Sequence, residues 1–74
     1  MIIGVPKEIK ESEYRVGMVP VGVELLSQAG HTVLVEREAG TGTGIPDADY
    51  AAAGAEMMKD HVEIFHRAEM IVKV

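Results

Sequence analysis

The chain has 74 residues, of which 47% are hydrophobic and 26% charged, with a formal net charge of −5 and no cysteine. This length suits one small domain, and the absence of cysteine excludes disulfides and thiolate metal sites. The negative net charge argues against nucleic acid and anionic membranes as partners. No apolar run is long enough to span a bilayer, and the first residues, MIIGVPKE, do not resemble a signal peptide. We therefore expect a cytoplasmic protein.

The first half of the chain predicts a strand, a helix and a second strand. Residues 2–5 (IIGV) form a short apolar run ended by a proline, which is typical of a buried strand. Residues 19–29 carry apolar side chains at helical spacing, and Gly30 stands where a left-handed residue ends a helix. Residues 31–36 (HTVLVE) are apolar and β-branched and predict a strand. The charged residues 36–38 that end it are expected to be solvated.

The second half continues the alternation of strands and helices. Residues 37–46 contain three glycines and predict a loop. Residues 47–53 predict a helix capped by its first residue, an aspartate, and followed by a glycine. Residues 55–58 give a weak signal for a third strand, Asp60 begins another helix, and residues 69–74 (EMIVKV) form the last strand.

This βαβαβαβ order predicts an α/β fold. We expect a mainly parallel, Rossmann-like sheet with helices on its faces. A parallel sheet requires both faces covered and both edges protected. The last predicted strand runs to the final residue, so this sequence has no residues after it that could do so. The sheet is therefore expected to be incomplete at the carboxyl terminus, in a chain that is part of a larger protein.

Two groups of residues that often mark binding sites are interpreted as structural. The glycine-rich segment AGTGTG lacks the spacing of a dinucleotide-binding GxGxxG motif, and Asp47 and Asp49 in the helix that follows would repel a pyrophosphate. We expect a turn there. The histidines do not converge in the sequence, and the two in the last helix lie on different faces, so they predict no metal site and no other chemistry. They are His31, His61 and His66.

The polar segment PKEIKESEYRVGMVP, residues 6–20, lies between the first strand and the first helix. It is either a solvated loop or a loop that presents Arg15 to a bound anion, since a guanidinium matches a carboxylate bidentately. Arg15 follows the first strand at the carboxyl edge of the sheet, where open α/β folds bind ligands. Lys7 and Lys10 share the segment, and the residues alone leave both interpretations open.

Four runs of the sequence resemble the amino terminus of NAD-dependent alanine dehydrogenases. They are IIGVPKEIKESEYRVGMVPVGVELLSQAGHTVLVE, AGTGTG, DADYAAAGAE and AEMIVKV. The resemblance extends over essentially all 74 residues, and its most specific parts are GVPKE followed by ExRV, together with AGH at a strand start. The same module occurs in the alpha subunit of proton-translocating nicotinamide nucleotide transhydrogenase and, more distantly, in saccharopine-type dehydrogenases. Gly30-His31 and the AGTGTG segment favour alanine dehydrogenase.

The resemblance implies a function for a longer parent enzyme. Residues 1–74 would be the amino-terminal part of its catalytic (substrate) domain, and its NAD-binding domain would be absent from this chain. The parent would catalyse the reversible oxidative deamination of L-alanine to pyruvate and ammonia, with hydride passing to NAD. Arg15 matches the arginine that clamps the substrate carboxylate. The family also implies a homo-oligomer, often a hexamer.

The other active-site residues of the family fall outside this sequence. Its substrate-contacting lysine would follow Val74, Lys73 is not assigned that role, and the catalytic histidine and its aspartate lie farther downstream. We therefore expect the chain to hold one substrate contact, no catalytic residue, no cofactor or metal site, and no activity by itself. Val19 replaces a threonine that usually caps the helix, and Glu38 replaces a loop glycine.

Two alternatives remain open. The chain could be the amino-terminal part of the transhydrogenase alpha subunit. It could also be a truncated, non-catalytic domain that pairs its open sheet edge with a second copy. In the second case Arg15 has no ligand and the sheet edge is the functional surface.

Overall fold

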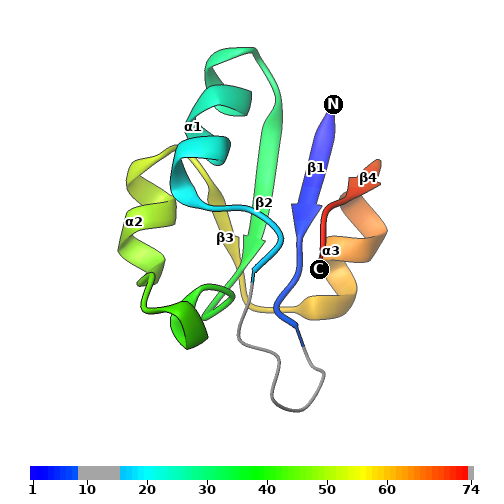
Figure 1. The fold of residues 1–74 in the computed structure, drawn as a ribbon. Coiled ribbons are helices and arrows are strands. Elements are labelled where there is room, and N and C mark those ends of the chain that lie inside the picture. Colours follow the sequence, from blue (N-terminus) through cyan, green and yellow to red (C-terminus); the bar gives the residue numbers. More distant parts are fainter. Residues whose placement is uncertain (9–15, 74) are drawn as a thin grey trace.

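The computed structural model describes residues 1–8 and 16–73 and shows a parallel four-stranded sheet with helices on both faces (Figure 1). The predicted α/β class and the alternation of strands and helices are confirmed. The elements in chain order are β1 (Ile2–Val5), α1 (Pro20–Gln28), β2 (Thr32–Glu36), η1 (Thr41–Thr43), α2 (Asp47–Ala52), β3 (Glu56–Met58), α3 (His61–Arg67) and β4 (Met70–Ile71).

The strand order is β3-β2-β1-β4, so the chain reverses its direction across the sheet at β1. β1 pairs on one side with β2, with Val5 opposite Val35, and on its other side with β4, with Gly4 opposite Ile71. In open α/β sheets a ligand binds outside the carboxyl ends of the strands, where the order reverses. The carboxyl ends of β1 and β4 therefore flank the place where a ligand is expected.

Two apolar clusters hold helices to the opposite faces of the sheet. Side chains alternate across β2, so Val33 and Val35 lie in one cluster and Leu34 in the other. The first cluster, beneath α1 and α2, consists of Val5, Val23, Val33, Val35, Ala39 and Tyr50. The second, beneath α3, consists of Leu34, Met58 and Ile64. Each fully buried aliphatic side chain stabilises the fold by about 1.5–3 kcal/mol.

Gly4 allows α3 to pack directly against β1. A Cβ atom at this position would lie 2.7 Å from Cγ2 of Ile64 and 2.9 Å from Cβ of Ala68. Contacts this short do not occur between real side chains, so any larger residue would push α3 away from the sheet. The glycine within the first apolar run thus has a packing role.

The helix ends follow the local signals in the sequence. Gly30 has φ +95° and ends α1, and the next amide, that of His31, donates to the carbonyl of Leu26 at 3.0 Å. Gly54, at φ +106°, ends α2 in the same way. At the start of α1 the residue in the cap position is Val19, which makes no side-chain capping bond.

Two element boundaries differ from the prediction. α2 begins after Pro46, and Asp47, predicted to be its cap, lies in the first turn and accepts the Glu38 amide at 2.7 Å. The last strand is shorter than residues 69–74, because in the described chain β4 has a partner on one side only and pairs with two residues of β1. Among the helices of residues 1–8 and 16–73, none has the length and apolar character needed to cross a membrane.

Candidate functional site

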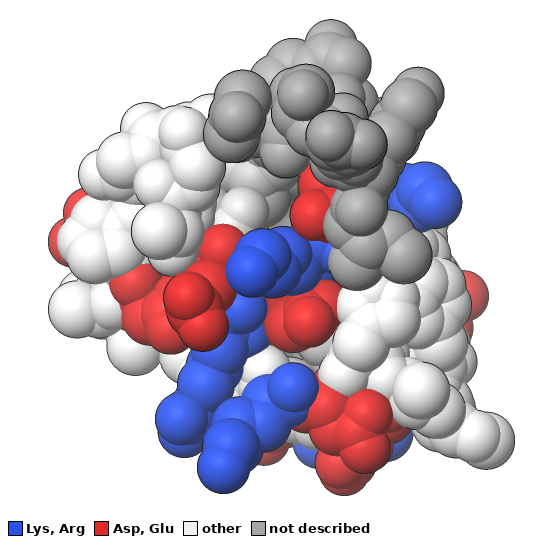
Figure 2. Space-filling view, turned by 90° about the horizontal axis from the view of Figure 1, so that it is seen from below, with Lys and Arg blue, Asp and Glu red and all other residues white. Residues whose placement is uncertain are grey.

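The candidate site is the carboxyl edge of the sheet, which Figure 2 views from below. On the part of this face that is not covered by grey atoms, Lys and Arg side chains form a strip that Asp and Glu side chains flank on both sides. Arg15, the predicted substrate contact, and Lys10 lie outside the described residues. The site is therefore built here from the residues that flank them on both sides.

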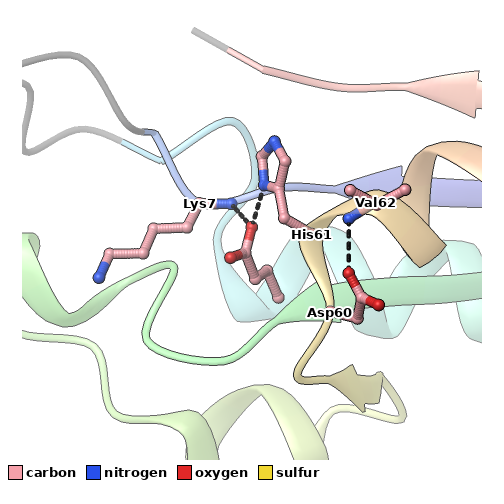
Figure 3. Close-up of polar contacts among 5 residues, drawn as sticks. Lys7, Asp60, His61 and Val62 are labelled. Atoms are coloured by element: carbon pink, nitrogen blue, oxygen red, sulfur yellow. Dashed lines mark hydrogen bonds and ion pairs between the residues drawn. The ribbon is translucent and has the colours of Figure 1, made fainter.

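Glu36, the last residue of β2, contacts the chain that follows β1 and the first residue of α3 at this edge (Figure 3). Its Oε1 atom accepts the backbone amide of Lys7 at 2.8 Å and lies 2.6 Å from Nδ1 of His61. Only 13% of the Glu36 side chain is exposed, so the expectation that it is a solvated strand end is wrong. Arg37 and Glu38, which follow it, are exposed as expected.

The backbone around Glu36 explains why its side chain makes these contacts. After β2 the chain turns toward β3, and the Arg37 amide donates to the carbonyl of Met58 at 2.8 Å. On the other side of β2, Pro6 has no amide hydrogen, so Lys7 supplies the first donor after Val5. The Glu36 carboxylate provides the acceptor for that donor.

His61 approaches the same carboxylate from the first turn of α3. Asp60 caps this helix by accepting the Val62 amide at 2.9 Å, which confirms that the helix begins there. An ionised carboxylate only accepts hydrogen bonds, so this contact is a hydrogen bond in the His61 tautomer that carries the hydrogen on Nδ1. The ring also packs against Phe65, with centroids 5.0 Å apart. Figure 3 shows the Lys7 side chain extending away from this cluster, so Lys7 takes part through its backbone.

The chain that leads into α1 is held by Tyr50. The Tyr50 side chain is fully buried, and its hydroxyl donates to the carbonyl of Met18 at 2.8 Å. Burial, and to a lesser extent the negative charge of Asp47, raises the pKa of the Tyr50 hydroxyl above its ordinary value. The hydroxyl therefore stays protonated and acts as a hydrogen-bond donor.

Gly17 brings the same stretch of chain against the end of β4. A Cβ atom on Gly17 would lie 2.6 Å from the carbonyl oxygen of Val72 and 2.9 Å from Cα of Lys73. Since backbone atoms cannot move aside as a flexible side chain can, only glycine fits here. The segments that follow β1 and β4 therefore meet at the reversal point of the sheet.

The glycine-rich segment does not suit a pyrophosphate. Residues Thr41–Thr43 form a short 3₁₀ turn, which confirms the prediction of a turn, and a Cβ on Gly40 would lie 2.8 Å from Cε2 of Tyr50. Gly40 thus serves packing. The same segment lines an open pocket of about 480 Å³ together with Asp47, whose carboxylate already accepts a hydrogen bond from the Glu38 amide. This segment therefore does not suit the phosphates of a dinucleotide.

The histidines lie in different surroundings. Nδ1 of His31 is 3.2 Å from the amino group of Met1, at the opposite edge of the sheet from His61. Within residues 1–8 and 16–73, no three or more His, Asp or Glu side chains gather in a way that could hold a metal ion.

The family model described as "Alanine dehydrogenase/PNT, N-terminal domain" matches residues 4–74. The chain belongs to this family. An alanine dehydrogenase from Methanococcus maripaludis is 54% identical to all 74 residues, which correspond to 20% of that protein, and one from Bilophila wadsworthia is 50% identical, with 19% of its length covered.

Solved structures give the same assignment. An L-alanine dehydrogenase has a TM-score of 0.94 and 51% identity over 99% of this chain, which corresponds to 20% of that protein. A transhydrogenase from Sinorhizobium meliloti has a TM-score of 0.88 and 34% identity over 99% of this chain and 21% of its own. The chain therefore spans about one fifth of the length of the alanine dehydrogenases that it matches.

Proposed function

We propose that this chain is the amino-terminal part of the substrate domain of an NAD-dependent alanine dehydrogenase. The observation that carries the proposal is the match of the entire chain to proteins of that name, at 54% identity in one case. The lower identity to the transhydrogenase, 34% against 51% for the solved alanine dehydrogenase, favours this function over the transhydrogenase alternative.

In the proposed reaction, L-alanine, water and NAD⁺ give pyruvate, ammonium, NADH and a proton. The chain contributes to substrate binding, and its NAD-binding partner domain is supplied by a part of the enzyme outside these residues. Arg15 pairs with the substrate carboxylate through its planar guanidinium. Such a pair orients the substrate Cα toward the nicotinamide, which is a positioning effect.

The described residues support this role by fixing the chain on both sides of the segment that contains Arg15. Glu36 holds Lys7 on the amino-terminal side, at 2.8 Å, and Tyr50 holds Met18 on the carboxyl-terminal side, at 2.8 Å. Both contacts lie at the carboxyl edge of the sheet, where open α/β folds bind ligands.

The test is a kinetic comparison in the full-length protein that contains this chain. NADH oxidation in the presence of pyruvate and ammonium reports the activity, and the KM for pyruvate reports the carboxylate contact. We expect Arg15→Ala to raise this KM about 10- to 100-fold, as the loss of a charged hydrogen-bonded pair does. Arg15→Lys, which keeps the charge without the planar fork, should give an intermediate KM. Arg37→Ala, which removes an exposed arginine from the same edge, is the control.

Each result has a distinct meaning. Absence of turnover in the wild-type protein contradicts the dehydrogenase function, and hydride transfer between nicotinamide nucleotides without turnover of pyruvate supports the transhydrogenase alternative. An unchanged pyruvate KM in Arg15→Ala removes Arg15 from the site. Light scattering of the same samples tests the homo-oligomer that the family resemblance supports.

A further inference from the structure

Helix α3 carries two large apolar side chains at its surface. Val62 is 61% exposed, and Phe65, the single phenylalanine of the chain, is 45% exposed. Together with His66 they line an open pocket of about 200 Å³, and because they are three or four positions apart they lie on one side of the helix. We call these three residues the α3 flank. Since Ile64 fills the face toward the sheet, α3 is apolar on two sides, which is typical of a helix that packs between neighbours.

The contacts of Arg67 show which way the α3 flank faces. Arg67 turns toward β3, where its Nη1 atom lies 2.7 Å from Oε2 of Glu56 and 3.7 Å from the sulfur of Met58. Consecutive residues of a helix are rotated by about 100°, so Phe65, two positions earlier, lies on nearly the opposite side of α3. Since β3 and β4 are the two outer strands of the described sheet, the α3 flank faces β4 and the space beyond it.

The strand β4 is incompletely covered on this side. In the described chain it pairs with β1 alone, through Met70 and Ile71. The side chain of Ile71 packs against the cluster beneath α3 and is still partly exposed. Parallel sheets are normally covered on both faces, so β4 requires a further element on the same face as α3.

The topology determines which face such an element occupies. From β1 to β2 and β3 the chain moves in one direction across the sheet, with α1 and α2 on one face. From β3 to β4 it moves back, with α3 on the other face (Figure 1). Right-handed crossovers, which connect parallel strands in nearly all sheets, produce this arrangement. A further parallel strand beside β4 continues the second direction, so its connecting helix lies on the face of α3.

We propose that the α3 flank is the docking surface for the helix that follows β4 in the longer protein and connects it to a further parallel strand. The inference rests on the proposed function, in which this chain is about one fifth of an alanine dehydrogenase. Apolar side chains of that helix contact Val62 and Phe65, since neighbouring helices pack about 8–10 Å apart. The helix belongs to the same polypeptide rather than to a second copy, because a short connection from β4 costs little loop-closure entropy.

The experiment places a photoreactive benzoylphenylalanine at position 65 of the full-length protein. This group keeps an aromatic ring at the site, and mass spectrometry of the irradiated and digested protein identifies the cross-linked peptide. We expect a cross-link within one polypeptide, to a residue within about 30 positions after Val74, the usual length of a strand–helix–strand unit. A second variant carries the group at position 62, in case the larger ring at position 65 prevents folding.

Glu63 provides the matched control. It is exposed on the same helix, one turn before Arg67 and on the side that faces away from the α3 flank. Benzoylphenylalanine at position 63 should therefore not give this cross-link.

Rates of thiol alkylation give a second readout with smaller substitutions. Residues 1–74 contain no cysteine, so Val62→Cys and Glu63→Cys each introduce one thiol into this region, and peptide mass spectrometry follows its modification. Both positions are exposed in the chain as described. With a helix docked on the α3 flank, Val62→Cys should be alkylated at least about tenfold more slowly than Glu63→Cys, because the reaction then requires local opening.

The outcomes separate this inference from the proposed function. A cross-link to a second copy, a cross-link to another region of the polypeptide, or no cross-link from either position overturns the inference. Equal alkylation rates at positions 62 and 63 also overturn it. None of these readouts requires turnover, so the expected cross-link in a protein that does not turn over pyruvate contradicts the proposed function alone. Normal turnover beside a cross-link elsewhere contradicts this inference alone.

Discussion

The hydroxyl of Tyr50 donates to the carbonyl of Met18, which lies 32 residues earlier in the chain, at 2.8 Å. The aromatic ring belongs to the first apolar cluster, whereas the hydroxyl reaches the chain between the polar segment and α1. One side chain therefore packs the core and fixes a residue that flanks the candidate site. This double role makes Tyr50 a sensitive place for substitution.

Replacing Tyr50 with phenylalanine should lower the free energy of unfolding by about 1–3 kcal/mol, since the Met18 carbonyl loses its donor while the ring remains. Urea unfolding of the wild-type and variant proteins measures the difference. Gln28→Ala is a suitable control, because it removes an exposed bond to Glu24 of 3.3 Å and should change stability by less than about 0.5 kcal/mol. Equal stabilities of wild type and Tyr50→Phe would contradict the importance of this bond.

The raised pKa of Tyr50 predicts a loss of stability in alkaline solution. In the unfolded chain this hydroxyl ionises near its ordinary pKa of about 10, whereas in the folded chain burial and then Asp47 keep it protonated to higher pH. Its contribution is therefore fully present below about pH 10 and is lost as the pH rises through the folded pKa, because the unfolded state then binds fewer protons.

The difference in unfolding free energy between wild type and Tyr50→Phe, measured from pH 8 to pH 11, isolates this effect. Other groups that titrate in this range are present in both proteins and cancel. The stability advantage of the wild type should decline above about pH 10. A difference that stays constant with pH would show that the hydroxyl is not shielded as described.

Replacing Gly17 with alanine should destabilise the fold by about 1–3 kcal/mol, the usual cost of an added group in a packed site. The new methyl group would overlap the carbonyl of Val72, so the chain after β1 and the end of β4 must separate. Thermal unfolding gives the measurement. Val21→Ala, which trims a side chain that is 62% exposed, should leave the melting temperature nearly unchanged. A melting temperature of Gly17→Ala equal to that of wild type would contradict the close approach.

Replacing Val19 with threonine should stabilise the protein by about 0.5–1 kcal/mol, because a hydroxyl in the cap position can accept an amide of the first turn of α1. Val19 has the extended backbone of a cap residue and is 47% exposed, so the β-branched substitute fits without repacking. Val19→Ala distinguishes capping from loss of an apolar contact. If threonine and alanine give the same melting temperature, the hydroxyl does not cap the helix.

The order of strands and helices could be predicted from the sequence because it depends on local signals. Apolar runs mark β1 and β2, and Gly30 and Gly54 mark helix ends with positive φ of +95° and +106°. Glu38 also adopts a positive φ, +66°, although it is not glycine. The family resemblance identifies its position as one that usually holds glycine, which adopts such a φ without strain.

The contacts at the carboxyl edge could not be predicted in this way. Glu36 and His61 are 25 residues apart, and the local sequence does not show whether a charged residue at the end of a strand is solvated or paired. Gly17 gave no signal either, since the backbone that it contacts is more than fifty residues away. The residues alone made Arg15 a candidate for binding an anion, and only the family resemblance assigned it to the substrate carboxylate. Arg15 lies outside the residues that the structure describes.

The position of β1 in the middle of the sheet has a consequence for synthesis on the ribosome. One side of β1 can pair once Glu36 has emerged, but its other partner, β4, ends at Ile71. At usual rates of translation about 2–7 s separate these two events, during which one edge of β1 has no partner strand from this chain and Gly4 lacks the covering helix α3. That edge therefore stays unpaired for longer than most small domains take to fold.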